Sequence, residues 1–175
     1  MAPPPGPPPG PPPSMALRTA LLFLRLFTIA ALFASIIVLT TNSAYLEIAS
    51  VELKVRFKDI YAYRYMLATI VMGMAYTLLQ IIFTLYYIST GNRVITGDGS
   101  FTFDFFGDKI VSYLLATGAA AGFGATKDMK SVFLGIGGAD KFFNKGYASA
   151  SLLLIAFVCT AMLSVFSSYA LPKRI

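Results

Sequence analysis

Twenty-eight consecutive residues without a charge run from Tyr65 to Asn92 and read YMLATIVMGMAYTLLQIIFTLYYISTGN. A helix needs about 20 mostly apolar residues to cross the ~30 Å hydrocarbon layer of a bilayer. Tyrosines precede this stretch and recur near its end, as expected for side chains that prefer the membrane interface. The stretch therefore predicts a membrane-spanning helix near residues 65–88.

Three more stretches of the sequence carry no charge. They are Leu26–Leu46 with 21 residues, Ile110–Thr126 with 17 and Gly146–Pro172 with 27. The period-two alternation of a lipid-facing β-barrel is absent from them. We therefore predict an all-α fold, an integral membrane four-helix bundle (tetraspan). Its four spans are expected near residues 17–41, 65–88, 107–126 and 147–169.

The composition excludes a soluble domain and most kinds of catalytic or metal site. Apolar residues make up 57% of the 175 residues against a usual ~45–50%, and charged residues 13% against ~25%. The chain has no His and one Cys, Cys159, which excludes an internal disulfide, a Cys/His zinc site and a Ser-His-Asp triad. A net charge of +6 spread along the chain does not favour nucleic acid as a partner. We predict no enzymatic activity, no cofactor and no metal.

The first connection, residues 42–64, contains an alternating segment. Its VELKVRF run, Val51–Phe57, predicts a short strand pair or hairpin outside the bilayer. The second connection, residues 89–106, contains Gly97-Asp98-Gly99, which is typical of a turn. The third, residues 127–146, carries four lysines and four glycines.

The two ends of the chain are short tails, residues 1–16 and 170–175. The first is rich in proline, and its glycines recur every fourth residue rather than every third, which excludes collagen. We predict an extended, disordered tail. The alternative is that its prolines dock on an aromatic groove of a binding partner.

Two charges lie where spans are expected. Arg25 is roughly 12 Å along the first predicted helix from Leu17, at about 1.5 Å per residue, and Asp108 opens the third. The first and third spans run in the same direction, so both charges lie toward the same leaflet. An ion pair between them would fix which helices pack together and in what register. The alternative is two unrelated charges, with Lys109 as the local partner of Asp108.

Small and hydroxyl-bearing residues indicate where helices pack. Gly118 and Gly122 have G-x-x-x-G spacing in the third span, and Ser149 and Ser151 form a small-residue stretch in the fourth. Such residues let helix backbones approach closely, within one chain or between subunits. The first span adds a seam of polar residues at seven-residue steps that is expected to face protein, Thr28, Ser35 and Asn42.

The charges of the connections bear on orientation. The first and third loops hold eight Lys and Arg residues, whereas the opposite side holds four. The positive-inside rule therefore favours these two loops in the cytoplasm and both termini outside.

Three segments resemble the Casparian strip membrane domain proteins of plants, and most closely the CASP-like proteins of the 4D subgroup. They are YAYRYM at Tyr61–Met66, FGDKIVSYLLATG at Phe106–Gly118 and KGYASASLLL at Lys145–Leu154. The proline-rich start and the Arg and Asp inside the spans resemble the family too. The resemblance covers nearly the whole chain from Leu17 onward.

The resemblance implies a multi-pass plasma-membrane protein with both termini cytosolic, which is opposite to the charge count; we follow the family. It implies homo- and hetero-oligomers with related tetraspan proteins, assembled into membrane scaffolds and akin to the MARVEL four-helix proteins. Arg25 and Asp108 correspond to the family's hallmark pair. Residues 42–64 lack the signature of the members that build the strip, and residues 127–146 lack their Cys and Trp.

The function expected from residues and resemblance together is a non-enzymatic scaffold that assembles laterally in the bilayer. The rival interpretation is a small four-span channel or transporter in which Arg25 and Asp108 line the path, because charges inside a membrane often mark conduction pathways.

Overall fold

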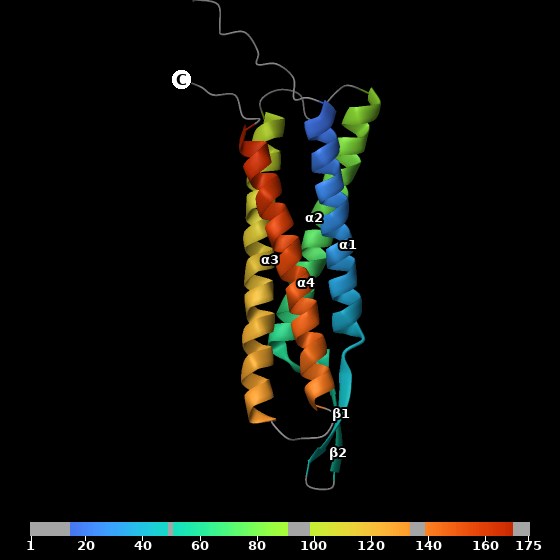
Figure 1. The fold of residues 1–175 in the computed structure, drawn as a ribbon, viewed down its shortest axis with the longest axis vertical. Helices are drawn as coiled ribbons and strands as arrows, with labels where there is room; N and C mark the ends of the chain where they lie inside the picture. Colours follow the sequence, from blue (N-terminus) through green and yellow to red (C-terminus); the bar gives the residue numbers. More distant parts are fainter. Residues whose placement is uncertain (1–14, 49–50, 91–98, 134–138, 170–175) are drawn as a thin grey trace, which may run out of the picture.

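The computed structural model describes residues 15–48, 51–90, 99–133 and 139–169. Four long helices form an up-and-down bundle, and a β-hairpin projects from one end of it (Figure 1). The helices are α1 (Met15–Thr40), α2 (Tyr61–Thr90), α3 (Gly99–Val132) and α4 (Ala139–Tyr169). The start of α1 and the end of α4 lie at the end of the bundle opposite the hairpin (Figure 1). The predicted all-α four-helix fold is confirmed.

Helices α2 and α3 extend beyond their predicted spans at both ends, and α4 extends beyond its span at its start only, whereas α1 begins two residues earlier and ends one residue earlier than predicted. A 30-residue helix such as α2 is about 45 Å long, well over the ~30 Å that hydrocarbon requires. The largest difference is in α3, which has 34 residues where residues 107–126 were expected to span. The charge-free stretches mark only the apolar part of each helix, because backbone hydrogen bonds continue the helix into its polar ends.

Three helical segments are long and apolar enough to cross a membrane by themselves, Thr19–Thr40, Tyr61–Thr90 and Ala139–Ser168. Among the described helices, α3 does not reach this measure, because Gly, Ala, Ser and Thr are common in its middle and charged residues lie on both sides of it. It nevertheless runs beside the other helices along the bundle (Figure 1). A bilayer that surrounds the three apolar helices therefore surrounds α3 as well.

The hairpin consists of β1 (Ser43–Ile48) and β2 (Val51–Arg56), which pair antiparallel from Ser43 opposite Arg56 to Ile48 opposite Val51. The predicted strand in VELKVRF is confirmed, and its partner strand begins three residues after α1 ends. A single 3-10 turn, η1 (Phe57–Asp59), connects the hairpin to α2.

Each helix of the bundle buries one face and leaves large apolar side chains on the other. On α1 the buried residues recur at helical spacing, Arg25, Thr28, Leu32, Ser35 and Leu39. The outward side chains include Phe23 at 67% exposed, Ile82 at 62% and Ile110 at 65%. A water-soluble bundle has the reverse pattern, with polar residues outside, so this surface fits hydrocarbon.

Candidate functional site

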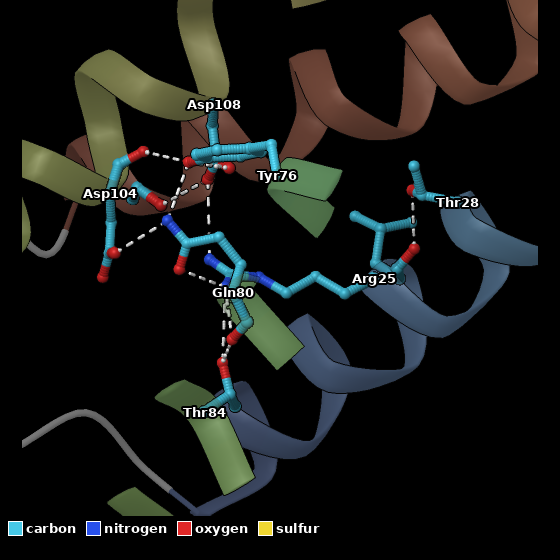
Figure 2. A network of polar contacts seen from close by, with 9 residues as sticks. Arg25, Thr28, Tyr76, Gln80, Thr84, Asp104 and Asp108 are labelled. Atoms are coloured by element: carbon cyan, nitrogen blue, oxygen red, sulfur yellow. Dashed lines mark hydrogen bonds and ion pairs between the residues drawn. The ribbon is translucent and has the colours of Figure 1, made fainter. Parts of the chain in front are cut away.

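Arg25 and Asp108 meet in the interior of the bundle (Figure 2), in the half of α1 that lies nearer its start. Arg25 Nη2 lies 3.6 Å from Asp108 Oδ2, and the two residues are only 5% and 1% exposed. They come from α1 and α3, which run in the same direction. The structure therefore brings the two predicted charges together at one depth. Lys109, by contrast, points outward over the ring of Phe105, 5.6 Å from its centroid.

A glutamine on α2 makes the shortest contact to the guanidinium. Arg25 Nη1 donates to Gln80 Oε1 at 2.7 Å and to the Gln80 carbonyl oxygen at 3.1 Å, both shorter than the ion pair (Figure 2). The same nitrogen lies 3.3 Å from Thr84 Oγ1 one turn further along α2. Arg25 is therefore held by α2 at least as closely as by Asp108.

The Gln80 amide nitrogen extends the contacts to α3. Nε2 donates to the Tyr76 hydroxyl at 2.8 Å and to Asp104 Oδ1 at 3.1 Å (Figure 2). Tyr76 in turn donates to Asp108 Oδ1 at 2.8 Å. One amide side chain thus links the guanidinium to both carboxylates, and we call Arg25, Tyr76, Gln80, Asp104 and Asp108 the polar cluster.

The fourth helix closes the polar cluster. Ser167 of α4 is buried, and its hydroxyl donates to Asp108 Oδ2 at 3.4 Å. Gly107 leaves room for the Tyr76 ring, because a Cβ there would lie 2.5 Å from the Tyr76 hydroxyl oxygen and 2.8 Å from Cε2. All four helices therefore contribute a side chain to a single set of contacts.

The two buried charges of the polar cluster, Arg25 and Asp108, compensate each other within the protein, whereas Asp104 is only half-buried. Removing one partner of a buried ion pair costs about 3–5 kcal/mol, because the other charge stays buried and unpaired. The intact pair contributes much less than this difference, since desolvation offsets the attraction. The contacts of the cluster join specific positions of α1, α2 and α3. Among the described side chains, Arg25 Nε is a buried nitrogen without a hydrogen-bond partner.

Tyr76, Gln80 and Asp104 were not predicted from the sequence. Gln80 is the chain's one glutamine, and it lies within the longest charge-free stretch. Tyr76, Gln80 and Thr84 follow at steps of four, as Asp104 and Asp108 do on α3. Two i,i+4 polar rows on consecutive helices are the pattern that could have revealed them.

The predicted G-x-x-x-G residues lie at close helix contacts. A Cβ on Gly118 would overlap Thr69 of α2, and one on Gly122 would lie 2.6 Å from Met66 Sδ and 3.2 Å from Ala150 Cβ. Both glycines therefore let α3 approach its neighbours within the chain.

The two serines of α4 differ. Ser149 and Ser35 are fully buried, and each hydroxyl donates to the other's carbonyl oxygen at 2.9 Å, which holds α1 and α4 together. Ser151 is exposed, because two residues along a helix turn the side chain by about 200°. Ser151 therefore does not pack inside the bundle, and a packing role for it between subunits stays a prediction.

The polar seam of α1 faces protein along its length. Thr28 donates to the Leu24 carbonyl within α1, and Asn42 Nδ2 donates to the Phe142 carbonyl at the start of α4 at 2.9 Å. Cys159 is buried in the same interior. No group of three or more His, Cys, Asp or Glu that could hold a metal occurs in the part of the chain that the structure describes.

These features define a class, a multi-pass membrane protein of four helices whose buried charges are compensated inside the bundle. The chain matches the model of the Casparian strip membrane protein domain over residues 14–159. It belongs to that plant family of membrane proteins, and the resemblance inferred from its residues is confirmed.

Relatives extend over the whole chain. It is 68% identical to "CASP-like protein 4D1" of Ricinus communis over 175 residues, which is 100% of both chains. It is 62% identical to "CASP-like protein 4D1" of Populus trichocarpa over 90% of this chain and 89% of the relative. It is 49% identical to "CASP-like protein 4D2" of Arabidopsis thaliana over 99% of both. No solved structure matches the chain.

Proposed function

We propose that this protein is a non-enzymatic scaffold of the plasma membrane. It assembles with copies of itself and with related four-span proteins into lateral platforms. The observation that carries the proposal is the internal compensation of the polar cluster, in which side chains of all four helices contact one another. Such an arrangement stabilises one packing of the helices and leaves the outer surface free for lateral contacts.

The outer surface fits lateral assembly. Every helix carries large exposed apolar side chains, such as Phe27 on α1 at 57%, Met72 on α2 at 60%, Tyr113 on α3 at 60% and Val165 on α4 at 54%. In a bilayer these faces meet either lipid tails or another helix, and helix association there depends on shape rather than on exclusion of water. Related tetraspan chains with the same bundle can therefore pack side by side without exposing polar groups to lipid.

Native mass spectrometry of the full chain, extracted together with its lipids, tests the proposal. We expect dimers or higher oligomers at low protein concentration, and mixed oligomers when a tagged CASP-like relative is co-expressed. A strictly monomeric protein that captures no relative would overturn it.

The rival function is that of a small channel or transporter, and one observation favours it. Asp104 is only half-buried, and Gln80 and Tyr76 connect it to the buried Asp108 through hydrogen bonds. A row of polar groups that runs from a partly exposed to a buried carboxylate can carry protons or cations. Flux into liposomes that is lost with Asp108→Asn would support this function, and no flux for H⁺, Na⁺ or K⁺ would support the scaffold.

The proposal includes the location, a multi-pass plasma-membrane protein with both termini in the cytosol, as the family resemblance suggests. A glycosylation acceptor inserted beside Lys54 in the hairpin tests the orientation. We expect the acceptor to be glycosylated, since the hairpin then faces the exterior. The proline-rich tail, residues 1–16, lies almost entirely outside the described residues, and a binding partner for it stays a prediction.

A further inference from the structure

Basic residues gather at the hairpin end of the bundle, and the scaffold function does not account for them. Exposed cations occur on the hairpin, on η1 and on the three helix ends nearby, Lys54, Arg56, Lys58, Arg64, Lys127, Lys141 and Lys145. Nothing in the polar cluster involves them, because that cluster lies toward the opposite end of the bundle (Figure 1).

Three of these cations lie at one level of the bundle. The Tyr63 hydroxyl lies 2.8 Å from Thr126 Oγ1, and Gly146 is so close to both side chains that a Cβ there would overlap the Tyr63 hydroxyl. This contact brings α2, α3 and α4 together at a single height. Arg64, Lys127 and Lys145 are the chain neighbours of the three contacting residues, and all three are exposed. We call Arg64, Lys127 and Lys145 the cation belt.

The cation belt lies where the apolar part of the bundle ends. On α3 and α4 the charge-free stretches stop at Thr126 and begin at Gly146, next to Lys127 and Lys145. On α2 the stretch begins at Tyr65, next to Arg64. Long basic side chains at such a boundary extend their charge into the headgroup layer while their methylene groups stay against apolar surface. The Arg64 guanidinium lies over the Tyr61 ring, 5.5 Å from its centroid, in the manner of side chains at an interface.

The belt cations have no acidic partner in the described part of the chain. The ion pairs found there are Arg25 with Asp108, and Lys130 with Asp140 at 3.6 Å. Three exposed cations without an ion pair, at one level on three different helices, are available to groups outside the protein. The groups present at that level of a bilayer are headgroup phosphates and carboxylates.

We propose that the cation belt binds the headgroups of anionic phospholipids, so that the bundle collects a shell of anionic lipid at its hairpin end. A basic side chain close to an anionic membrane surface strengthens association by roughly fivefold. Three act together here because they share one level. The affinity of the cation belt for anionic headgroups is a property of the bundle itself, so its measurement in micelles needs no assumption about orientation and is independent of the scaffold function.

The test uses the full chain purified into a micelle and titrated with phosphatidylserine or phosphatidylcholine of identical acyl chains. Native mass spectrometry counts the lipids that stay bound. Wild-type protein is expected to retain phosphatidylserine in preference. The triple variant Arg64→Gln, Lys127→Gln, Lys145→Gln is expected to lose at least about fivefold of that preference. Raised salt should weaken the preference of the wild-type protein.

A matched control changes the same residue types further from the apolar boundary. Lys54→Gln, Arg56→Gln, Lys58→Gln removes one Arg and two Lys from the hairpin and η1, all exposed, and should keep the preference. Equal losses in both triple variants, or no phosphatidylserine preference in the wild-type protein, would overturn the proposal. The proposal would also be overturned if the belt bound oligogalacturonate, a soluble polyanion, and showed no preference for phosphatidylserine. If the belt variant unfolds, two single changes replace it. Arg64→Lys should keep the wild-type preference for phosphatidylserine, and Arg64→Gln should reduce that preference.

Discussion

Replacing Gln80 with Met tests whether the glutamine, and not only the ion pair, holds the polar cluster together. Met has a similar length and no amide, so the change removes the 2.7 Å acceptor of Arg25 and the two hydrogen bonds donated by Nε2. A hydrogen bond to a charged group contributes about 1.5–3 kcal/mol, and a neutral one about 0.5–1.5 kcal/mol. Asp104 is half-buried, so water replaces part of what it loses. The expected cost is about 2–4 kcal/mol of the free energy of unfolding.

The assay is reversible unfolding in mixed dodecyl maltoside and sodium dodecyl sulfate micelles, followed by circular dichroism. Thr77→Val is the matched control on the same helix. Thr77 is buried, but its hydroxyl donates to the Gly73 carbonyl within α2 at 2.8 Å, so we expect a loss below about 1 kcal/mol.

A double-mutant cycle separates the glutamine from the ion pair. If Gln80 and Asp108 act on Arg25 as one network, Gln80→Met combined with Asp108→Asn should cost less than the sum of the two single changes, with a coupling of at least about 0.5 kcal/mol. The reasoning is refuted if Gln80→Met destabilises no more than Thr77→Val, or if the two changes simply add.

Three further pairs of variants test the remaining contacts of the bundle by the same unfolding assay. Arg25→Ala should cost about 3–5 kcal/mol because it leaves Asp108 buried without its cation, while Arg25→Asp with Asp108→Arg should recover part of the loss. Equal free energies of unfolding for the wild-type protein and both variants would contradict this. Gly118→Val should cost about 1–3 kcal/mol because its side chain meets Thr69, whereas Gly124→Ala, with open space around its Cβ, should be neutral or stabilising; equal effects would contradict close packing at Gly118. Ser149→Ala should cost about 1 kcal/mol through loss of its bond to Ser35, and the exposed Ser151→Ala should change stability by less than about 0.5 kcal/mol; reversed effects would show that the two serines have been placed wrongly.

Charge-free stretches were enough to predict four helices, because a bilayer sets a minimum length for an apolar helix. That Arg25 and Asp108 lie toward the same leaflet followed from helix direction, since spans one and three are parallel, but their contact did not. The helix ends did not follow, because their polar turns are no longer constrained by lipid. Nor does apolarity mark α3 as a span by itself, as its small residues are suited to packing rather than to hydrocarbon.

Gln80 escaped prediction for a different reason. A single amide in 28 charge-free residues lowers the apolar character too little to stand out, and its importance depends on which helix faces it. Ser151 shows the converse. The small residues around it are typical of a packing face, but its position on the helix directs its side chain away from the bundle interior. The charges and the lengths of the spans could therefore be predicted from the sequence. The direction in which each side chain points, and the residue that it contacts, required the three-dimensional arrangement.

The distribution of the polar cluster along the chain has a consequence for biosynthesis. Arg25 leaves the ribosome 55 residues before Gln80 and 83 residues (108 − 25) before Asp108. At about 5–20 residues per second, the guanidinium waits roughly 4–17 s for its carboxylate. During that interval the first helix carries a guanidinium whose hydrogen-bond and ion-pair partners have not yet been synthesised. The guanidinium can therefore be fully compensated only after the third helix has been synthesised.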